Sequence, residues 1–424
     1  MQDSLSYLEG LKQRGINLGI GPISRLLTRL DNPQTKYKTV LIGGTNGKGS
    51  TAAILSSILM KEGMKVGLYT SPHMCDFRER IRINSCMIPE DELCALVDKV
   101  KGEIKEDVTY FEFTTALAFL YFSRCEVDIA VVEVGMGGRL DATNLMFPEV
   151  SVITNISLEH QKYLGNDLES IAREKGGIIK ENGICVTAAK GRKVIDTLEK
   201  ICSQRGSAFY KTGRDIRVRR FGKGSFSYYG INKSYRGLRS SLAGGHQIEN
   251  AALALAVVDI LTAKGMDIND NSVVEGLRDV KWEGRLELVS RNPGIVVDGA
   301  HNPAGISSLC NSLPADFSYR RLIVVFGVLR DKDYAGMLKR LMPLADRIIL
   351  TRPKEERAAR IEDLLSVTSL YHDHVEAIAD SAEALARARF LAGVDDLVCI
   401  TGSLYLVGEI KEHMSFDLTK DRLL

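Results

Sequence analysis

The glycine-rich segment GGTNGKGS, at residues 43–50, restricts the fold of this chain more than any other stretch of the sequence. An apolar, β-branched run precedes it, and a segment with helical spacing follows it. A strand, a glycine-rich loop and a helix in this order form a P-loop, whose backbone N–H groups face a phosphate at the helix N-terminus. The usual P-loop places the hydroxyl residue directly after the lysine, whereas here Gly49 separates Lys48 from Ser50. We therefore predict a nucleotide-binding β-loop-α-β unit at residues 40–70, with an unusual loop.

Each residue type in this loop has a chemical role in binding phosphate or Mg²⁺. The four glycines let the backbone turn its N–H groups toward phosphate. Lys48 supplies a positive charge for the phosphates, and Ser50 supplies a hydroxyl for Mg²⁺. The competing interpretation is a glycine-rich turn before a helix, which the strand–loop–helix order together with Lys48 and Ser50 disfavours. The additional glycine argues against the spellings usual in GTPases and kinases.

Short apolar runs alternate with longer helical segments along the chain, which is typical of an α/β fold with a mostly parallel sheet. The stretch 214–242 differs, because its Tyr, Arg and Gly residues with partial alternation predict antiparallel hairpins at a sheet edge. A long helix is expected over residues 244–265. The first expected strands occupy residues 39–44, 65–70, 128–134, 150–156 and 183–189.

The α/β pattern restarts after Arg285, without a second P-loop. Strands are expected at residues 294–299, 321–327, 347–351, 375–380 and 397–402. We therefore predict two domains. Residues 1–284 form a P-loop domain with a mostly parallel sheet, and residues 285–424 form a smaller, Rossmann-like α/β domain.

Composition excludes some classes of partner. The 424 residues carry a net charge of +2, so the overall charge does not indicate a nucleic-acid or anionic-membrane binder. No apolar run approaches the ~20 residues that span a bilayer. The opening MQDSLSYLEG lacks a basic start followed by an apolar run, so no signal peptide is expected. These features predict a cytoplasmic protein.

Three polar residues near strand and helix ends have two interpretations each. Glu133 ends an apolar strand, where ligands bind in open α/β sheets, so it is either a Mg²⁺ ligand or a solvated glutamate. His160 follows the next strand, and its residue type alone indicates a structural or catalytic histidine, because Mg²⁺ prefers oxygen. Lys175 stands beside a glutamate, which alone indicates a charge on a helix surface.

The second predicted domain has a similar cluster. Asp298 ends a strand, with His301 and Asn302 just beyond it, at the ligand-binding rim of a sheet. Arg285 stands at the predicted boundary, where its guanidinium is suited to clamp a nucleotide phosphate after domain closure. Taken alone, Arg285 favours an interdomain ion pair.

Together these segments resemble the folylpolyglutamate synthase and dihydrofolate synthase family, of the wider Mur-ligase type. The family spells its P-loop with a glycine between the lysine and the serine. Departures are small: EKGGI stands where EKAGI is usual, and Asn17 stands where Asp is frequent. The shared motifs cover almost the whole chain and are GGTNGKGS, YTSPH followed by RERI, TYFEFTTALAF, EVGMGGRLDATN, SLEH, IAREKGGIIK, GGHQIENA, WEGRLE, DGAHNP, GVLRDKDY and ITGSLYLVGE.

The resemblance implies a role for residues of every motif. The implied ligands of two Mg²⁺ sites are Ser50, Ser71, Glu133, His160 and Lys175. The implied ATP contacts are Thr45, Asn46, Gly47, Lys48, Gly49, Ser50, Asn250, Arg285, Asp298 and His301. The implied pterin contacts are Asn17, Leu18, Gly19, Ile20, Thr109, Tyr110, Phe111, Glu112, Leu140, Asp141 and Ala142. The implied catalytic residues are Lys48, Glu133, His160 and Lys175.

Lys175 matches a lysine that the family carries as a carbamate, an N6-carboxylysine. The resemblance thereby reverses the helix-surface interpretation of this residue, because a carbamate is an anionic oxygen ligand suited to Mg²⁺.

The reaction that the resemblance implies is ATP-dependent amide formation. A substrate carboxylate attacks the γ-phosphate and becomes an acyl phosphate, from which the α-amine of L-glutamate then displaces phosphate. The C-terminal domain is expected to close over ATP and to bind glutamate, and the expected state is a monomer. The sequence leaves open whether a folate with its glutamate tail, dihydropteroate or both are extended.

The alternatives are another Mur-type amide ligase, a P-loop small-molecule kinase or NTPase, and a non-catalytic nucleotide-binding module. A kinase does not need a second α/β domain with DGAHNP. A non-catalytic module does not need Ser71, Glu133, His160 and Lys175 together.

Overall fold

Strand β1 (Lys38–Gly43) lies inside an eight-stranded sheet and leads directly into the glycine-rich loop. The computed structural model describes residues 2–12, 15, 17–222, 224–369 and 371–420. The strand order is β4-β3-β2-β5-β1-β6-β7-β8, and only the pairs made by β3 are antiparallel. The sheet is therefore mostly parallel, as predicted. Its other strands are β2 (Val66–Tyr69), β3 (Ile81–Ile83), β4 (Cys86–Met87), β5 (Ile129–Glu133), β6 (Val150–Ile153), β7 (Ile184–Thr187) and β8 (Ala208–Lys211).

Helices cover both faces of this sheet. Side chains of β1 alternate between the faces, so that Leu41 packs in one apolar core while Val40 and Ile42 pack in the other. Covering both faces is the usual arrangement for parallel strands, which are buried on each side. The Leu41 side has α1 (Gln2–Lys12), α2 (Gly21–Arg29), α4 (Glu90–Gly102), α5 (Tyr110–Arg124), α6 (Gln161–Leu164), α7 (Leu168–Gly176) and α8 (Arg192–Gln204). The other side has α3 (Lys48–Lys61), α9 (Gly245–Ala263) and α10 (Asp270–Asp279).

Residues 217–239 form a separate antiparallel sheet, with β9 (Arg217–Gly222), β10 (Ser225–Tyr229) and β11 (Ser234–Arg239). The prediction of hairpins is confirmed, but their expected place at the edge of the large sheet is wrong. The reason is an apolar face formed by Phe226, Tyr228 and Leu238, which are buried in the core that α9 and α10 share. This face packs the small sheet on helices instead of extending the large one.

The C-terminal part is built on a six-stranded sheet, in the order β12-β13-β17-β14-β15-β16. Strand β12 pairs antiparallel to β13, and the remaining pairs are parallel. Two apolar cores cover its faces, as a buried Rossmann-like sheet requires. The strands are β12 (Glu287–Arg291), β13 (Gly294–Asp298), β14 (Leu322–Phe326), β15 (Arg347–Leu350), β16 (Val375–Ala377) and β17 (Leu397–Thr401). The helices are α11 (Pro303–Asp316), α12 (Tyr334–Leu341), α13 (Ile361–Thr368), α14 (Ser381–Leu391) and α15 (Leu404–Lys420).

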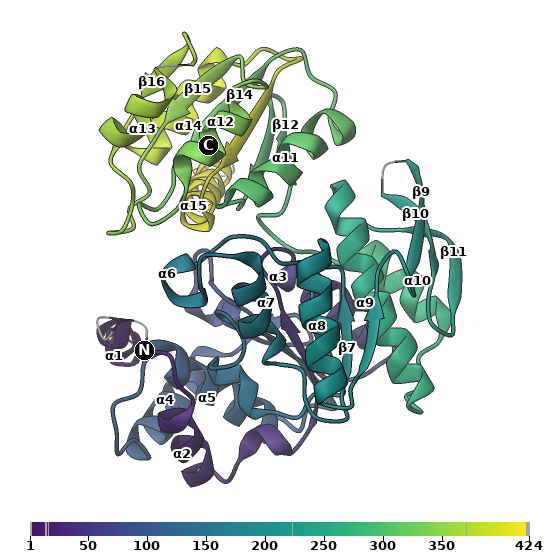
Figure 1. The fold of residues 1–424 in the computed structure, drawn as a ribbon. Helices are drawn as coiled ribbons and strands as arrows, with labels where there is room; N and C mark the ends of the chain where they lie inside the picture. Colours follow the sequence, from purple (N-terminus) through teal and green to yellow (C-terminus); the bar gives the residue numbers. More distant parts are fainter. Residues whose placement is uncertain (1, 13–14, 16, 223, 370, 421–424) are drawn as a thin grey trace.

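Figure 1 shows the two sheets in two parts, the six-stranded part above the eight-stranded part. The chain passes between them once, in the connection from α10 to β12. The predicted boundary at Arg285 falls inside this connection, and the division into residues 1–284 and 285–424 stays a prediction. Within the described ranges, no helix combines the length and the apolar character needed to span a membrane.

Gly276 in α10 is the point of closest approach between α10 and α3. A Cβ added at Gly276 lies 2.5 Å from the backbone Cα of Ile58, which is too close for any side chain without backbone movement. We predict that Gly276→Ala lowers the free energy of unfolding by about 1–3 kcal/mol, the usual cost of overpacking. The measurement is urea unfolding followed by circular dichroism.

The matched control is Gly102→Ala at the end of α4. A Cβ there meets nothing within 4 Å. This substitution should instead raise the free energy of unfolding by up to about 1 kcal/mol, because alanine loses less backbone entropy on folding. Equal effects of the two substitutions would contradict the close approach of α10 to α3.

Candidate active site

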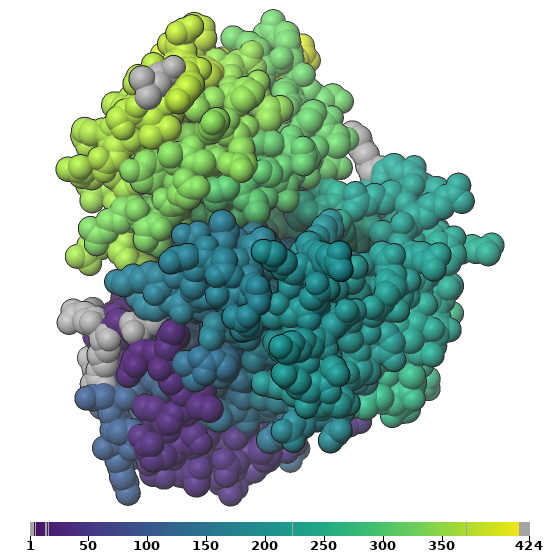
Figure 2. All heavy atoms as spheres, viewed as in Figure 1, coloured from purple at the N-terminus to yellow at the C-terminus, as the bar shows by residue number. Residues whose placement is uncertain are grey.

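A cavity of about 1760 Å³ lies between the two parts of the molecule. The space-filling view shows the C-terminal part, green to yellow, resting on the N-terminal part (Figure 2). The cavity wall contains all residues of the predicted binding and metal sets except two. Ile20, which precedes α2, is not part of the cavity wall. Lys175 is buried behind the cavity wall. The fold thus brings predicted residues from both halves of the sequence to one site.

The P-loop is held in place by the loop that follows β6. The carbonyl of Asn46 accepts hydrogen bonds from Thr154 Oγ1 (2.7 Å) and from Asn155 Nδ2 (2.9 Å). The amide N–H of Asn46 donates to Asn155 Oδ1 (3.0 Å), and the N–H of Thr45 donates to the Asn155 carbonyl (2.8 Å). The loop is therefore preorganised by a neighbouring strand end, independently of any nucleotide.

Two glycines of the P-loop are required by close neighbours. Gly47 has a φ of +86°, and a Cβ at this position lies 2.3 Å from Oδ1 of Asn250. Gly49 is the additional glycine, and a Cβ there lies 3.1 Å from the ring of Trp282 and 3.3 Å from Oε2 of Glu133. The additional glycine therefore stands where the start of α3 packs tightly against an indole and a carboxylate, and a side chain there would need these neighbours to shift by a few tenths of an ångström.

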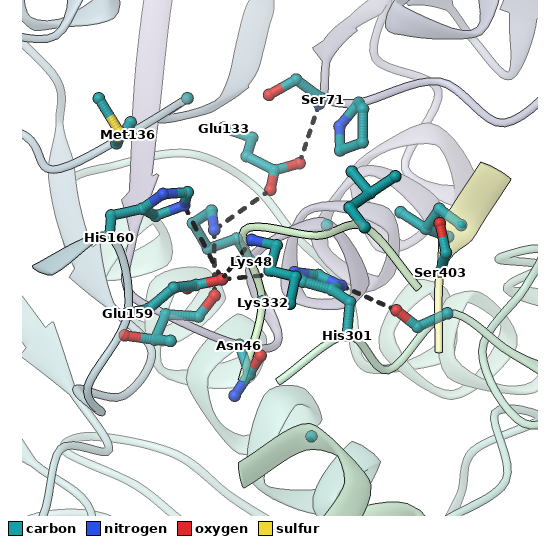
Figure 3. A pocket seen from close by; sticks show the side chains of 18 of the residues that line it. Asn46, Lys48, Ser71, Glu133, Met136, Glu159, His160, His301, Lys332 and Ser403 are labelled. Atoms are coloured by element: carbon teal, nitrogen blue, oxygen red, sulfur yellow. Dashed lines mark hydrogen bonds and ion pairs between the residues drawn. The ribbon is translucent and has the colours of Figure 1, made fainter. Parts of the chain in front are cut away.

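Glu133 ends β5 beside this loop. Its carboxylate lies 3.7 Å from Lys48 Nζ and accepts a hydrogen bond from the backbone N–H of Ser71 (3.3 Å) (Figure 3). Burial raises the pKa of Glu133 above its ordinary value, against the opposing charge of Lys48. A cation bound next to this carboxylate would compensate its buried charge.

His160 begins α6 and points into the same region of the cavity (Figure 3). Burial lowers its pKa to about 4, and the neighbouring carboxylate of Glu159 opposes this shift only in part. The imidazole is therefore neutral at pH 7, and a neutral ring nitrogen has the lone pair that a metal ligand needs.

Lys175 is buried, with 3% of its surface exposed, so the interpretation as a helix-surface charge is wrong. It lies on the buried side of α7 with Ile171 and Ala172, and its Nζ donates to the carbonyl of Gly44 in the P-loop (2.8 Å). Burial, with a further contribution from the charge of Lys48, lowers the pKa of Lys175 to about 7. A large fraction of this side chain is therefore a neutral amine at neutral pH.

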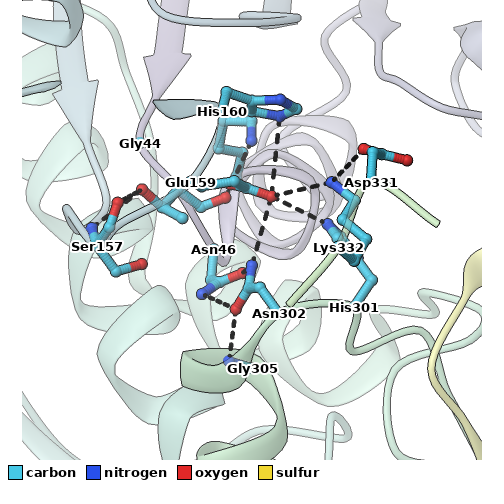
Figure 4. Close-up of polar contacts among 12 residues, drawn as sticks. Gly44, Asn46, Ser157, Glu159, His160, His301, Asn302, Gly305, Asp331 and Lys332 are labelled. Atoms are coloured by element: carbon cyan, nitrogen blue, oxygen red, sulfur yellow. Dashed lines mark hydrogen bonds and ion pairs between the residues drawn. The ribbon is translucent and has the colours of Figure 1, made fainter. Parts of the chain in front are cut away.

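Glu159 is a site residue that the sequence interpretation missed. Its side chain is 9% exposed, and Oε1 lies 3.4 Å from His301 Nε2, 3.6 Å from Lys332 Nζ and 3.8 Å from His160 Nε2 (Figure 4). Burial alone would raise the pKa of Glu159, but the hydrogen bond from His301 and the nearby positive charges hold it well below its ordinary value. The only local sequence signal for Glu159 as a site residue was its position, three residues after an expected strand.

The C-terminal part contributes side chains from the loops after its strands. Asp298 accepts hydrogen bonds from the N–H groups of Leu286 and Ala300 (2.8 and 2.9 Å), so it fixes the backbone just before β12 and just after β13. Arg285 lines the cavity, and its Nη1 donates to the Gly284 carbonyl (3.2 Å). Arg285, Asp298 and His301 therefore line the cavity, and Asn302 contacts the P-loop directly through Asn46.

The predicted pterin contacts form the far end of the cavity wall. Thr109 and Glu112 cap α5 reciprocally, since Glu112 Oε2 accepts from the N–H and the hydroxyl of Thr109 (2.8 and 2.9 Å). Asp141 accepts from the N–H of Met136 and the hydroxyl of Thr143 (2.8 and 2.6 Å). These polar side chains hold their own loops in place, and the rings of Tyr110 and Phe111 line the cavity beside them.

Arg80 is a second residue that the sequence interpretation did not single out. It lines this end of the cavity, is 7% exposed, and lies 5.4 Å from the ring centroid of Tyr110. A buried guanidinium beside an aromatic ring is suited to an anionic, planar ligand.

The donor set near the P-loop fits a divalent cation that completes its ligand shell from phosphate and water. Ser50 and Glu133 offer oxygen, and His160 offers a neutral nitrogen. No cluster of three or more His, Cys, Asp or Glu side chains arranged for a metal exists within the described ranges. Mg²⁺ usually binds few protein ligands and completes its coordination with phosphate and water.

Models of two protein families match the chain. The Mur ligase middle domain matches residues 42–258, and the domain described as Mur ligase, glutamate ligase domain matches residues 284–404. The chain is 35% identical to the dihydrofolate synthase/folylpolyglutamate synthase of Bacillus subtilis (strain 168), over 97% of this chain and 99% of that protein.

Two solved structures are similar over nearly their whole length. The Escherichia coli FolC complex with DHPP and ADP has a TM-score of 0.90 at 31% identity and covers 98% of each chain. The bifunctional folylpolyglutamate synthase/dihydrofolate synthase of Yersinia pestis, complexed with AMPPNP and a Mn ion, has a TM-score of 0.88 at 30% identity and covers 97% of each chain.

The depressed pKa of Lys175 has a consequence for stability. Between about pH 7 and its ordinary pKa of 10.5, the unfolded chain binds a proton at Lys175 that the folded chain does not bind. The contribution of the neutral lysine to the free energy of unfolding is therefore fully present above pH 10.5 and is lost as the pH falls to 7. We predict that the free energy of unfolding rises with pH in this window, by up to about 1.4 kcal/mol per pH unit from this group.

Lys175→Met should remove this part of the slope. Urea unfolding at pH 7, 8 and 9 in CO₂-depleted buffer measures it, with the exposed Lys200→Met as the control that should keep the slope of the unsubstituted protein. Identical slopes in all three proteins would show that Lys175 is charged in the folded state.

Proposed function

The chain belongs to the folylpolyglutamate synthase and dihydrofolate synthase family of Mur ligases, and from this membership we propose how its own residues join L-glutamate to the carboxylate of a folate or of dihydropteroate. It is an ATP-dependent ligase. The assignment of roles to individual residues rests on one observation. A P-loop with Lys48 and the buried Glu133 forms one wall of a cavity whose opposite wall is contributed by the glutamate ligase domain.

The reaction has two chemical steps. The substrate carboxylate attacks the γ-phosphate of ATP, which forms an acyl phosphate and releases ADP. The α-amine of glutamate then attacks the acyl carbon, phosphate leaves, and an amide remains. Two anions must meet in the first step, so that catalysis consists mainly of positioning and electrostatic stabilisation.

The P-loop residues Thr45 to Ser50 supply the phosphate site in this proposal. The backbone N–H groups of Gly47 to Ser50 lie at the start of α3, where the helix dipole favours negative charge. Those of Thr45 and Asn46 donate to Asn155 instead. Lys48 holds a positive charge 3.7 Å from Glu133, within reach of a phosphate in the cavity. Asn250, Arg285, Asp298 and His301 complete the proposed nucleotide contacts from the side facing the P-loop.

Two Mg²⁺ sites are part of the proposal. The residues that would hold the ions are Ser50, Ser71, Glu133, His160 and Lys175. Bound Mg²⁺ would supply charge neutralisation for the carboxylate and the triphosphate. The buried Glu133 and the neutral His160 support this assignment, since both have ligand atoms without a competing proton once a cation is present.

Lys175 enters the metal set only as a carbamate, because an ammonium group has donors and no acceptor. Its neutral amine adds to CO₂ and loses a proton, which gives an anionic group with two acceptor oxygens. The burial of Lys175 and its pKa of about 7 support this modification, since both favour the neutral amine.

The pterin ring is proposed to bind at the far end of the cavity. The proposed contacts there come from three segments, namely residues 17–20, Thr109–Glu112 and residues 140–142. The ring of Phe111 lies 6.1 Å from that of Tyr69 and stacks on it, so that a planar ligand meets a fixed aromatic surface.

The second domain, residues 285–424 in this proposal, closes over ATP and binds glutamate. Closure keeps water from the acyl phosphate, which would otherwise hydrolyse. We keep the predictions of a monomer in the cytoplasm that acts without a nucleic-acid or membrane partner.

A substrate panel tests the proposed function. Dihydropteroate, tetrahydrofolate and its polyglutamates are each supplied with ATP, Mg²⁺ and glutamate, while ADP, phosphate and the product mass are measured. We expect phosphate release that requires both glutamate and a pterin. Release without glutamate would indicate a kinase or an NTPase, and no turnover with any pterin would overturn the proposal.

Lys48→Ala should reduce turnover in this assay on the order of 10²–10³-fold, the usual effect of losing one electrostatic contact to a transition state. Circular dichroism and the unfolding midpoint provide the control for folding. A folded variant with nearly normal turnover would remove Lys48 from the phosphate site.

Lys175→Ala should be almost inactive and partly rescued by a short carboxylic acid in the buffer, because the free acid replaces the carbamate oxygens. Lys175→Arg fills the space and should not be rescued. Full activity of the unsubstituted enzyme in CO₂-depleted buffer, with an unmodified lysine by mass spectrometry, would disprove the carbamate.

A further inference from the structure

Glu159 stands where the two parts of the molecule meet, and no role proposed above uses it. Its loop follows β6, whereas two of its partners come from the C-terminal part, His301 after β13 and Lys332 after β14. Asn302 Nδ2 also lies 3.5 Å from Oε1 of Glu159. One carboxylate oxygen therefore faces donors from two separate loops of the opposite domain (Figure 4).

A pair of amides continues this contact toward the P-loop. Asn46 Nδ2 donates to Asn302 Oδ1 (3.2 Å), and Asn302 Nδ2 donates to Asn46 Oδ1 (2.9 Å). Asn302 also caps α11 by accepting from the N–H of Gly305 (2.8 Å). The P-loop, the Glu159 loop and the start of α11 consequently meet at one place.

The charge of Glu159 favours the closed arrangement of the two parts. A buried carboxylate needs compensating cations, because it has lost its hydration. With the parts together, the carboxylate faces the ammonium group of Lys332 and the ring of His301, and separation of the parts removes both neighbours. Separation therefore removes most of the compensation.

Glu159 also fixes the orientation of both partners. The His301 ring is held at two points, by the Gly299 carbonyl at Nδ1 (2.9 Å) and by Glu159 at Nε2. The side chain of Lys332 is 14% exposed, and its Nζ lies 3.6 Å from Glu159 and 3.9 Å from Asp331. Both side chains line the cavity from the side of the glutamate ligase domain.

We propose that Glu159 is a positioning residue that locks the glutamate ligase domain onto the P-loop domain and aligns Lys332 for the glutamate-dependent step. The inference rests on the proposed function. The P-loop itself is held by Thr154 and Asn155, and the His301 ring keeps its hydrogen bond with the Gly299 carbonyl, so nucleotide binding does not depend on Glu159.

The test is Glu159→Gln, which keeps the size of the side chain and removes its charge. We expect the KM for glutamate to rise about tenfold or more, within the usual range of coupling between sites. The Kd for ATP with Mg²⁺, measured by calorimetry without pterin or glutamate, should change by less than about twofold. Small-angle X-ray scattering of the variant with ADP and Mg²⁺ should show a larger radius of gyration than that of the unsubstituted protein.

Three further variants make the result specific. Glu159→Asp keeps the charge and should recover part of the glutamate KM. Lys332→Met should raise the same KM, and combining it with Glu159→Gln should add little further. Asp396→Asn is the control, because Asp396 is a buried carboxylate paired with Arg321 (2.5 Å) inside the C-terminal part and away from the cavity, and its glutamate KM should stay unchanged.

A glutamate KM within about twofold of the unsubstituted enzyme, or equal losses of ATP and glutamate affinity, would overturn the inference. Failure of the unsubstituted enzyme to turn over any pterin would overturn the proposed function instead. In that case the ATP affinity and the radius of gyration of Glu159→Gln still test the lock.

Discussion

The parallel pairing of β1 with β5 and β6 is the constraint on which the site depends. Ile42 of β1 lies opposite Glu133 of β5, and Gly43 lies opposite Ile153 of β6. Parallel strands end at the same edge of a sheet, so the P-loop, Glu133 and the Glu159 loop must emerge together. Shifting any of these strands by one residue would turn its side chains to the other core and move the polar residues at its end out of the site.

Charge compensation then divides the buried ionisable groups of the site into two kinds. Glu133 has Lys48, and Glu159 has Lys332 and the ring of His301 from the opposite domain. Lys175 differs, because in the described part of the chain its ammonium has a backbone carbonyl and no ion pair. Burial, together with the charge of Lys48, lowers the pKa of this lysine and favours its neutral amine, and a neutral amine is the form open to modification.

The sequence predicts the helices and strands that have a local apolar pattern. It misses side-chain contacts between residues that are far apart in the chain. The apolar, β-branched inner strands of both sheets and the strand β16 are predicted, whereas β3 and β4 are too short for a detectable alternation. The edge strands β8 and β12 are also missed. Lys175 was misread from its neighbouring glutamate, although its i, i+4 spacing from the apolar Ile171 would have placed it on the buried side of the helix. Glu159 could not be recognised, because its main partners stand more than a hundred residues away in the sequence.

The packing of Gly49 against Trp282 has an optical consequence. Trp282 is the single tryptophan of the chain, it is half-buried, and the guanidinium of Arg82 lies 5.8 Å from its ring centroid. Its indole touches the first turn of α3, the turn that faces the proposed phosphate site. All tryptophan emission of this protein therefore originates beside the P-loop, so the intrinsic fluorescence of the unlabelled chain reports on the nucleotide site without a background from other indoles.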